Sequence, residues 1–401
     1  MMDPDSNILC TRLKSFEDAA SFKNEWDDLV IRNGSPVYMS YTWCRTWWEY
    51  YGAGKELAIF IFRDGSRLIA ILPIYIDSIS LGILNLRIAK IVGACIPDRV
   101  FDPPIEPSIS DRVFAILVDV LFKDIKVDLL SFGSLREDYH PRNSLLDCCR
   151  SNNSQIGKVI SEVNGVFSRF DIPPSFEQYM AGLSKNRRGK LRRENRTLKE
   201  SGFSMEKINE FRYESDFRIF MEMHARQWNS LGRLGHFHSW PSAGDFHQEL
   251  SRRMAKEGKL RFFKMSENGI PVAYLYTYNF GKSNFAELSA RNIDEKYSWC
   301  SMGSHLLIEL FNACRKENID FVEAGAAHYD YKIGLGARKI NTFNVIAVSS
   351  KWKSRFGSEL LFIVRYFIHN VYYRIWYQRI QPRLPVSFRK PILWAWIRTS
   401  Y

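Results

Sequence analysis

The apolar positions of this chain gather in short β-type runs and in longer helical patterns, and the same order of patterns occurs twice. Two stretches, residues 57–76 and 260–279, consist of β-rich runs on either side of Asp64-Gly65 and Asn268-Gly269. An Asp-Gly or Asn-Gly pair between two such runs favours a tight turn, because both residues accept positive φ. The pattern therefore predicts two β-hairpins.

Other elements recur around the hairpins in a matching order. A Trp-rich helical stretch precedes each hairpin, at 42–51 and 217–231. A stretch with helical apolar spacing follows each hairpin, at 113–122 and 305–313, and leads into a further strand, at 127–134 and 319–326. The order indicates a divergent duplication, with chance likeness between two α/β domains as the alternative. Because each half mixes antiparallel hairpins with helices, we expect an α+β fold with mixed, largely antiparallel sheets.

Composition and charge refine this organisation. The chain has 401 residues, 46% of them hydrophobic and 25% charged, which is typical of a globular protein of two domains. Residues 351–401 hold ten Lys or Arg and one acid, Glu359, and so carry most of the net charge of +12. We expect domains at 1–165 and 166–350, followed by a basic, aromatic, helical tail at 351–401.

The cysteines and the absence of a leader pattern bear on location. Seven scattered cysteines without a C-x-x-C pair fit a reducing compartment. The polar, acidic start has no signal-peptide pattern, and no apolar stretch has the length of a spanning helix. We therefore expect a cytoplasmic protein, which could associate with the inner face of a membrane through the tail.

Five segments in the second half of the chain share their order and spacing with a known family. They are LSKNRRGKLRRENRTLKESG (183–202), FMEMHARQWNSLGRLGHF (220–237), GIPVAYLYTY (269–278), NIDEKYSWCSMGSHLL (292–307) and FVEAGAAHYDYK (321–332). With them the chain resembles GNAT-superfamily acyltransferases of the CelD/BcsL kind, which are related to the Fem peptidyltransferases. The resemblance implies two tandem GNAT-like domains, of which the first is degenerate.

The resemblance also implies a function. We expect an N-acyltransferase that moves an acyl group from acyl-CoA, the co-substrate, to an amine such as an amino sugar or another precursor of an envelope polysaccharide. Two alternatives stay open. One is an aminoacyl-tRNA-dependent, Fem-like transferase, and the other is a non-catalytic accessory module at a membrane surface for polysaccharide assembly.

Ionisable residues concentrate on one loop of the second half. Lys332 and Tyr331 follow the strand at 319–326, together with His328 and Asp330. Acyl transfer to an amine needs proton removal, oxyanion stabilisation and protonation of the leaving group. By resemblance, Lys332 holds anionic substrate groups or the oxyanion, Tyr331 donates a proton or positions the substrate, and His328 and Asp330 contact the substrate. The alternative is a solvated turn.

Two carboxylates on neighbouring strands are candidate general bases. Glu323 lies among apolar residues, where desolvation would raise its pKa, and Glu287 has a similar setting on the strand 285–290. Arg291 at the end of that strand is a candidate phosphate ligand. For either carboxylate, the alternative is a residue on the wet face of an edge strand.

Two further segments suggest anion binding. The turn with Ser301, Gly303 and Ser304 precedes a helix, whose N-terminal N–H groups could bind a phosphate of the cofactor or simply be capped by Ser304. The helical run 185–199 has eight basic residues, among which Arg187, Arg188 and Arg192 are candidate substrate ligands. The alternative for this run is a solvated charged face.

The remaining features bear on the binding of a metal, a nucleic acid or a membrane. The histidines at 224, 236, 238 and 247 match no metal-ligand spacing, so we expect no metal. The tail mixes basic residues with Trp and Tyr along a helical apolar stripe, which suits an anionic membrane surface, packing on the body or nucleic acid. As a partner, tRNA is less favoured than a small-molecule or sugar-linked acceptor.

Overall fold

The structure is a computed structural model that describes residues 8–94, 99–209 and 213–389. The chain divides into two compact units. The first unit contains the chain up to Gly165 and returns with Asn341–Ile375, and the second contains Val166–Ile340 and continues from Trp376. Residues 341–350, which the sequence analysis assigned to the second domain, thus lie in the first unit, as does the start of the tail.

The first unit is built from helices on a sheet whose strands are mostly antiparallel. Its elements are β1 (Ile8–Leu13), α1 (Lys23–Arg32), α2 (Tyr41–Tyr51), β2 (Glu56–Asp64), β3 (Arg67–Leu81), β4 (Leu84–Ile91), α3 (Ser110–Asp119) with a π-helical turn (Val120–Asp124), β5 (Leu129–Arg136), α4 (Pro141–Ser151), and later β12 (Arg338–Ser349) and α11 (Trp352–Phe367). Short 3-10 turns lie at Ala20–Phe22, Val37–Met39 and Pro107–Ile109.

The strand order in this unit is β1-β2-β3-β4-β5-β12. β1 to β4 run antiparallel, β5 is parallel to β4, and β12 is antiparallel to β5. The hairpin predicted around Asp64-Gly65 is confirmed as β2 and β3, and Gly65 has the positive φ of 57° that its turn requires.

The second unit has the same kind of architecture. Its elements are the end of β6 (Ile156–Asp171), α5 (Phe176–Gly182), α6 (Lys185–Glu200), β7 (Phe203–Lys207), α7 (Glu214–Ser230), α8 (Ala243–Lys256), β8 (Leu260–Glu267), β9 (Ile270–Phe280), β10 (Ser283–Arg291), α9 (Met302–Lys316), β11 (Phe321–Ala326) and α10 (Asp330–Gly334), with a 3-10 turn at Glu295–Tyr297. After α11 the chain continues through a π-helical segment (Ile368–Ile380) and 3-10 turns at Gln381–Arg383 and Val386–Phe388.

The strand order in the second unit is β6-β11-β10-β9-β8-β7. β7 to β10 run antiparallel, β11 is parallel to β10, and β6 is antiparallel to β11. The second predicted hairpin is confirmed as β8 and β9. Its turn residues Asn268 and Gly269 have φ of 50° and 81°, as an Asn-Gly hairpin turn requires.

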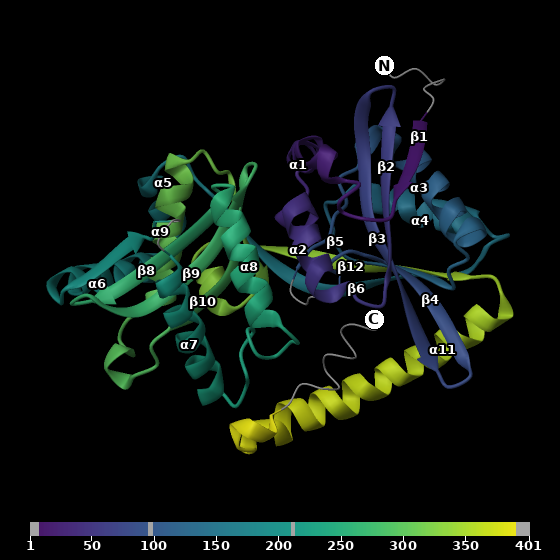
Figure 1. Cartoon of the computed structure of the whole chain (residues 1–401). Helices are drawn as coiled ribbons and strands as arrows, with labels where there is room; N and C mark the ends of the chain where they lie inside the picture. Colours follow the sequence, from purple (N-terminus) through teal and green to yellow (C-terminus); the bar gives the residue numbers. More distant parts are fainter. Residues whose placement is uncertain (1–7, 95–98, 210–212, 390–401) are drawn as a thin grey trace. The chain divides into compact units, whose positions relative to one another are not determined.

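Helices cover both faces of this second sheet (Figure 1). On one face, α5, α6 and α9 bury Leu191, Leu306 and Phe311 against Ala273 and Leu275 of β9. On the other face, α7 and α8 pack against the tyrosines of β9. Neighbouring residues of a strand point to opposite faces, so β9 supplies both cores.

The predicted repeat is visible in the strand order. In each unit three antiparallel strands are followed by a crossover helix and a parallel strand: β2-β3-β4, α3 and β5 in the first, and β8-β9-β10, α9 and β11 in the second. The last strand is exchanged, because β6 follows the first half in sequence but pairs with β11, whereas β12 follows the second half but pairs with β5. The predicted α+β fold is confirmed, with the strands of both units in one largely antiparallel sheet flanked by helices.

The predicted tail helix is present as α11 and the π-helical segment that continues it. No helix in the described parts of the chain combines the length and the apolar character needed to cross a membrane.

Candidate active site

The candidate site is organised by the point at which two parallel strands separate. β10 and β11 pair in register over only three positions, which end at Phe285 opposite Glu323. Directly afterwards β10 has a β-bulge between Ala286 and Leu288, which places Glu287 at the irregular position. Because a bulge bends its strand and re-aims a side chain, β10 departs from β11 here. The two predicted carboxylates, Glu287 and Glu323, therefore flank the same point.

Glu287 is held inside the unit. Its side chain is only 1% exposed, and its Oε1 lies 4.0 Å from Nδ1 of His247 on α8, which is also buried. The imidazole ring of His247 in turn lies edge-on to Phe237. Glu287 thus pairs a buried carboxylate with a titratable neighbour. Sequence reasoning missed His247, because only the fold brings α8 to this strand.

Glu323 has a charged partner that the sequence did not reveal. Nη2 and Nε of Arg169 on β6 lie 2.6 Å and 2.8 Å from Oε1 of Glu323. Both side chains are at most 10% exposed. The expectation of apolar surroundings for Glu323 therefore needs correction, because the register of β6 on β11 sets Arg169 directly opposite this carboxylate.

Lys332 lies on α10 and is buried, at 4% exposed. Its Nζ donates hydrogen bonds to the backbone carbonyls of Ala324, Ala326 and Ala327 over 2.8, 2.9 and 3.0 Å. An ammonium group has three hydrogens, and these carbonyls can engage all of them. In this structure Lys332 fastens the end of β11 to α10.

The other predicted residues of this loop lie around that anchor. Tyr331 is 46% exposed and its ring stacks on Tyr329 at a centroid distance of 6.2 Å. His328 is half-buried, with Nδ1 2.9 Å from Oγ of Ser168 on β6. Asp330 is exposed in the first turn of α10. Tyr331 and Asp330 are therefore accessible to a ligand, whereas Lys332 is not.

The start of α9 contacts α6, so the two segments that were predicted to bind anions lie together. Ser301 is the N-cap residue, and Ser304 accepts a hydrogen bond from Nη2 of Arg187 over 2.9 Å. Nε of Arg187 has no hydrogen-bond partner among the described residues. A side chain added at Gly303 would meet no atom within 4 Å. The helix start thus combines N-terminal N–H groups, a guanidinium and open space.

A carboxylate that the sequence analysis did not single out lies beside this helix start. Glu194 of α6 is 2.9 Å from Nε2 of His305 and 3.6 Å from Nζ of Lys190. Burial raises the pKa of Glu194, but the hydrogen bond and charge of His305 and the charge of Lys190 outweigh it, so the pKa lies below its usual value. Glu194 is therefore ionised at neutral pH and joins α6 to α9.

The remaining predicted basic residues have separate roles. Arg188 donates to the carbonyls of Met180, Ala181 and Leu183, which end α5, so it caps that helix. Arg192 is exposed on α6. The side chain of Arg291 is exposed at the end of β10. Of the three arginines of α6 that were predicted to bind substrate, Arg187 contacts the start of α9, through its hydrogen bond to Ser304.

The edge of β10 beyond the bulge is covered by α7. Nδ1 of His224 donates to the carbonyl of Ser289 over 2.9 Å, and the N–H of Arg291 donates to Gln227 over 2.9 Å. Burial and the neighbouring His236 lower the pKa of His224 to about 3. The ring is therefore neutral, and its Nε2 accepts a hydrogen bond from the N–H of His236.

The residues at the start of α9 fit an acyl-CoA. A pyrophosphate needs N–H donors and positive charge, which the first turn of α9 and Arg187 provide, and the space at Gly303 lets it approach the backbone. For a metal, the described residues offer no group of three or more His, Cys, Asp or Glu side chains that could hold an ion.

Comparison with known proteins defines the class. Residues 185–333, which include α6, β10, α9 and β11, match the family model described as an acetyltransferase (GNAT) domain. Over these residues the chain is therefore similar to GNAT acetyltransferase domains. The narrower resemblance to CelD/BcsL proteins stays a prediction.

The solved structure of FemX agrees with the fold at low sequence identity. FemX is 9% identical in sequence to this chain, and the two structures superpose with a TM-score of 0.58. The match covers 82% of this chain and 96% of the FemX chain. A tandem GNAT protein from the clavulanic acid biosynthesis pathway is 11% identical, with coverages of 85% and 98% and a TM-score of 0.46. No curated protein sequence matches the chain.

Proposed function

We propose that the second unit is an N-acyltransferase that transfers an acyl group from acyl-CoA to an amine, with the acceptor an amino sugar or another precursor of an envelope polysaccharide. The observation that carries the proposal is the separation of β10 and β11 at two buried carboxylates, beside a helix start with Arg187 and open space at Gly303. A bound acyl-CoA supplies the acyl group as an activated thioester.

The residues of the chain have distinct tasks in this proposal. Arg187 and the first N–H groups of α9 bind the pyrophosphate. Glu287 takes the proton of the acceptor ammonium, since its carboxylate is buried at the bulge where β10 leaves β11, beside His247. Arg169 and Lys332 position Glu323 and the loop, and the accessible Tyr331 contacts the acceptor.

The test begins with binding of acetyl-CoA followed by thermal unfolding. A ligand at a hundredfold excess over Kd stabilises the folded state by about 2.7 kcal/mol, which gives a measurable rise in Tm. Gly303→Asp puts a negative charge where the pyrophosphate is proposed to lie and should abolish the rise, whereas the matched Gly303→Ala, whose added Cβ meets no atom of the chain within 4 Å, should reduce it much less. Glu287→Gln should keep the rise but lose turnover with a panel of amino sugars and other amines. If no acyl-CoA stabilises the wild-type chain, the proposal fails.

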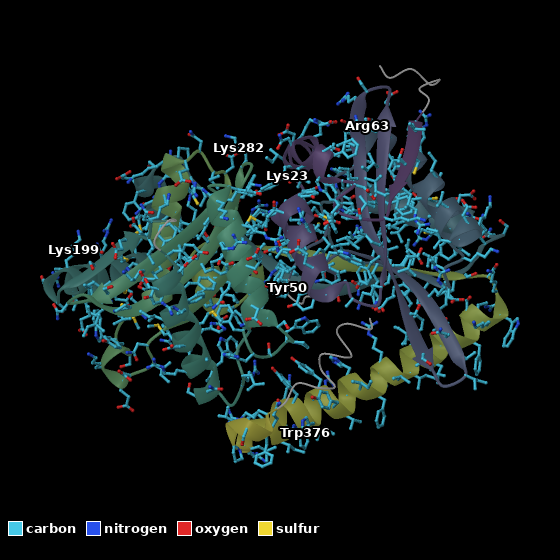
Figure 2. All side chains as sticks on the ribbon, in the orientation of Figure 1. Lys23, Tyr50, Arg63, Lys199, Lys282 and Trp376 are labelled. Atoms are coloured by element: carbon cyan, nitrogen blue, oxygen red, sulfur yellow. The ribbon has the colours of Figure 1, made fainter. Side chains whose placement is uncertain are left out.

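One observation favours a second candidate, transfer from an aminoacyl-tRNA. Arg192, Arg193, Arg196 and Lys199 are all exposed on α6, and Lys199 is marked on this helix in Figure 2. An exposed basic helix of this kind suits an RNA backbone. Binding of tRNA that weakens with salt and is lost in Arg192→Gln/Arg196→Gln, with no response to acyl-CoA, would favour this candidate over the first.

A further inference from the structure

The helix α11 is fastened to the first unit by one narrow face. Ser354, Gly357, Ser358 and Leu361 are buried there. A side chain on Gly357 would come within 2.7 Å of Leu86 on β4, so the helix backbone lies directly on the sheet. Since these residues stand at positions i, i+3, i+4 and i+7, they define one side of the helix.

The opposite side of the same helix is apolar and exposed. We call it the apolar stripe, and its members are Trp352 (77% exposed), Phe356 (60%), Ile363 (64%), Phe367 (63%), Val371 (41%) and Ile375 (46%). They recur every four or seven residues, which keeps them on one side of α11 and of the wider turns that follow it. Six large apolar side chains in one line exceed the scattered exposure that is normal for a protein surface.

The charges beside the apolar stripe have one sign. Basic side chains are exposed on the helix and on the turns that follow it in the same unit: Lys351, Lys353, Arg355 and Arg374. The one acidic residue of the whole segment 351–401, Glu359, is paired with Lys158 over 2.6 Å. The surface that meets this face is therefore expected to be negatively charged as well as apolar.

We propose that the apolar stripe docks on the surface of an anionic lipid bilayer, with the helix lying in the plane of the interface. An amphipathic helix binds there by burying its apolar side among the acyl chains while basic residues meet the anionic headgroups. Aliphatic residues such as Ile363, Val371 and Ile375 fit hydrocarbon, whereas a nucleic-acid surface would need chiefly aromatic and cationic groups. This inference does not depend on the proposed acyl transfer.

Flotation of the full-length protein with lipid vesicles tests the proposal. Vesicles of phosphatidylcholine and phosphatidylglycerol in equal amounts should carry the protein upward, and vesicles of phosphatidylcholine alone should not. The variant Phe367→Ser/Val371→Ser/Ile375→Ser should lower the partition coefficient on the order of a hundredfold, because three apolar side chains no longer enter the acyl region. The matched control is Ile83→Ser, which replaces a fully exposed apolar residue in the turn between β3 and β4.

A second pair of variants tests the charge. Lys353→Gln/Arg374→Gln should weaken binding on the order of twentyfold, since each basic residue near an anionic surface contributes a factor of about five. Lys256→Gln on α8 is the control and should not weaken it. Unfolding curves of all variants should match the wild type, because the substituted side chains are exposed.

Three outcomes would overturn the proposal. The full-length protein could fail to float with anionic vesicles, or the serine variant could float as well as the wild type. In the third, the protein would not bind vesicles and would use this face for something else. It would either form a dimer that the serine variant abolishes or bind tRNA through this face. The face would then belong to a second copy or to RNA.

Discussion

Replacing Lys332 by methionine should destabilise the second unit, because this ammonium is a structural anchor. Methionine keeps the length and apolar stem of the side chain but removes the donor to the carbonyls of Ala324, Ala326 and Ala327. Three hydrogen bonds to a charged group amount to roughly 4.5–9 kcal/mol. Burial of the ammonium, which methionine avoids, offsets several kcal/mol of that sum. We therefore expect a net loss of about 3 kcal/mol.

Urea unfolding followed by circular dichroism measures this loss, and for a unit of this size it corresponds to a fall in Tm of roughly 6–12 °C. Lys332→Arg should recover part of the loss, since its planar guanidinium cannot direct donors at all three carbonyls. The matched control is Lys339→Met, an exposed lysine nearby, which should change stability by less than about 0.5 kcal/mol. An unchanged unfolding free energy for Lys332→Met would refute the reasoning and return Lys332 to a role in binding substrate.

Two further predictions concern buried charges in the second unit. Glu323→Leu and Arg169→Met should each cost about 3–5 kcal/mol in unfolding free energy, because each leaves a buried charged group without its partner, while the double variant Arg169→Met/Glu323→Leu should recover part of the loss. Additive losses in this double-mutant cycle would show that the pair is not coupled. Neutral His224 contributes stability that is fully present above its unfolded pKa of 6.5 and is lost as pH falls from there toward about 3, by about 1.4 kcal/mol per pH unit. His224→Gln should flatten this acid limb of the unfolding free energy, and an unaltered slope would contradict the burial of the neutral ring.

The hairpins and helices could be predicted from sequence because their signals are local. The Asp-Gly and Asn-Gly turns, the spacing in 305–313 and the basic run 185–199 each lie within about twenty residues, and each element formed as expected. The charged partners could not be predicted in this way. Arg169 and Glu323 are 154 residues apart in sequence, and only the register of β6 on β11 joins them.

The same reason explains why the role of Lys332 in this structure was not foreseen. A lysine after a glycine-containing loop has no local sign of whether it meets substrate or its own backbone. Which of the two the lysine contacts depends on the backbone conformation at Ala327, whose φ is 64°. In this conformation the carbonyl oxygen of Ala327 accepts a hydrogen bond from Nζ of Lys332 on α10. Tertiary structure therefore decided what the residue pattern left open.

The exchange of the last strands between the two halves has a consequence for synthesis of the chain. The partner of β5 is β12, at 342–348, so this edge of the first sheet has to wait until nearly the whole second half has left the ribosome. An unpaired strand is a template for wrong pairing with other chains. The nascent first half is thus expected to be a substrate for chaperones, and a first half made without β12 would lack the strand that pairs with this edge of β5.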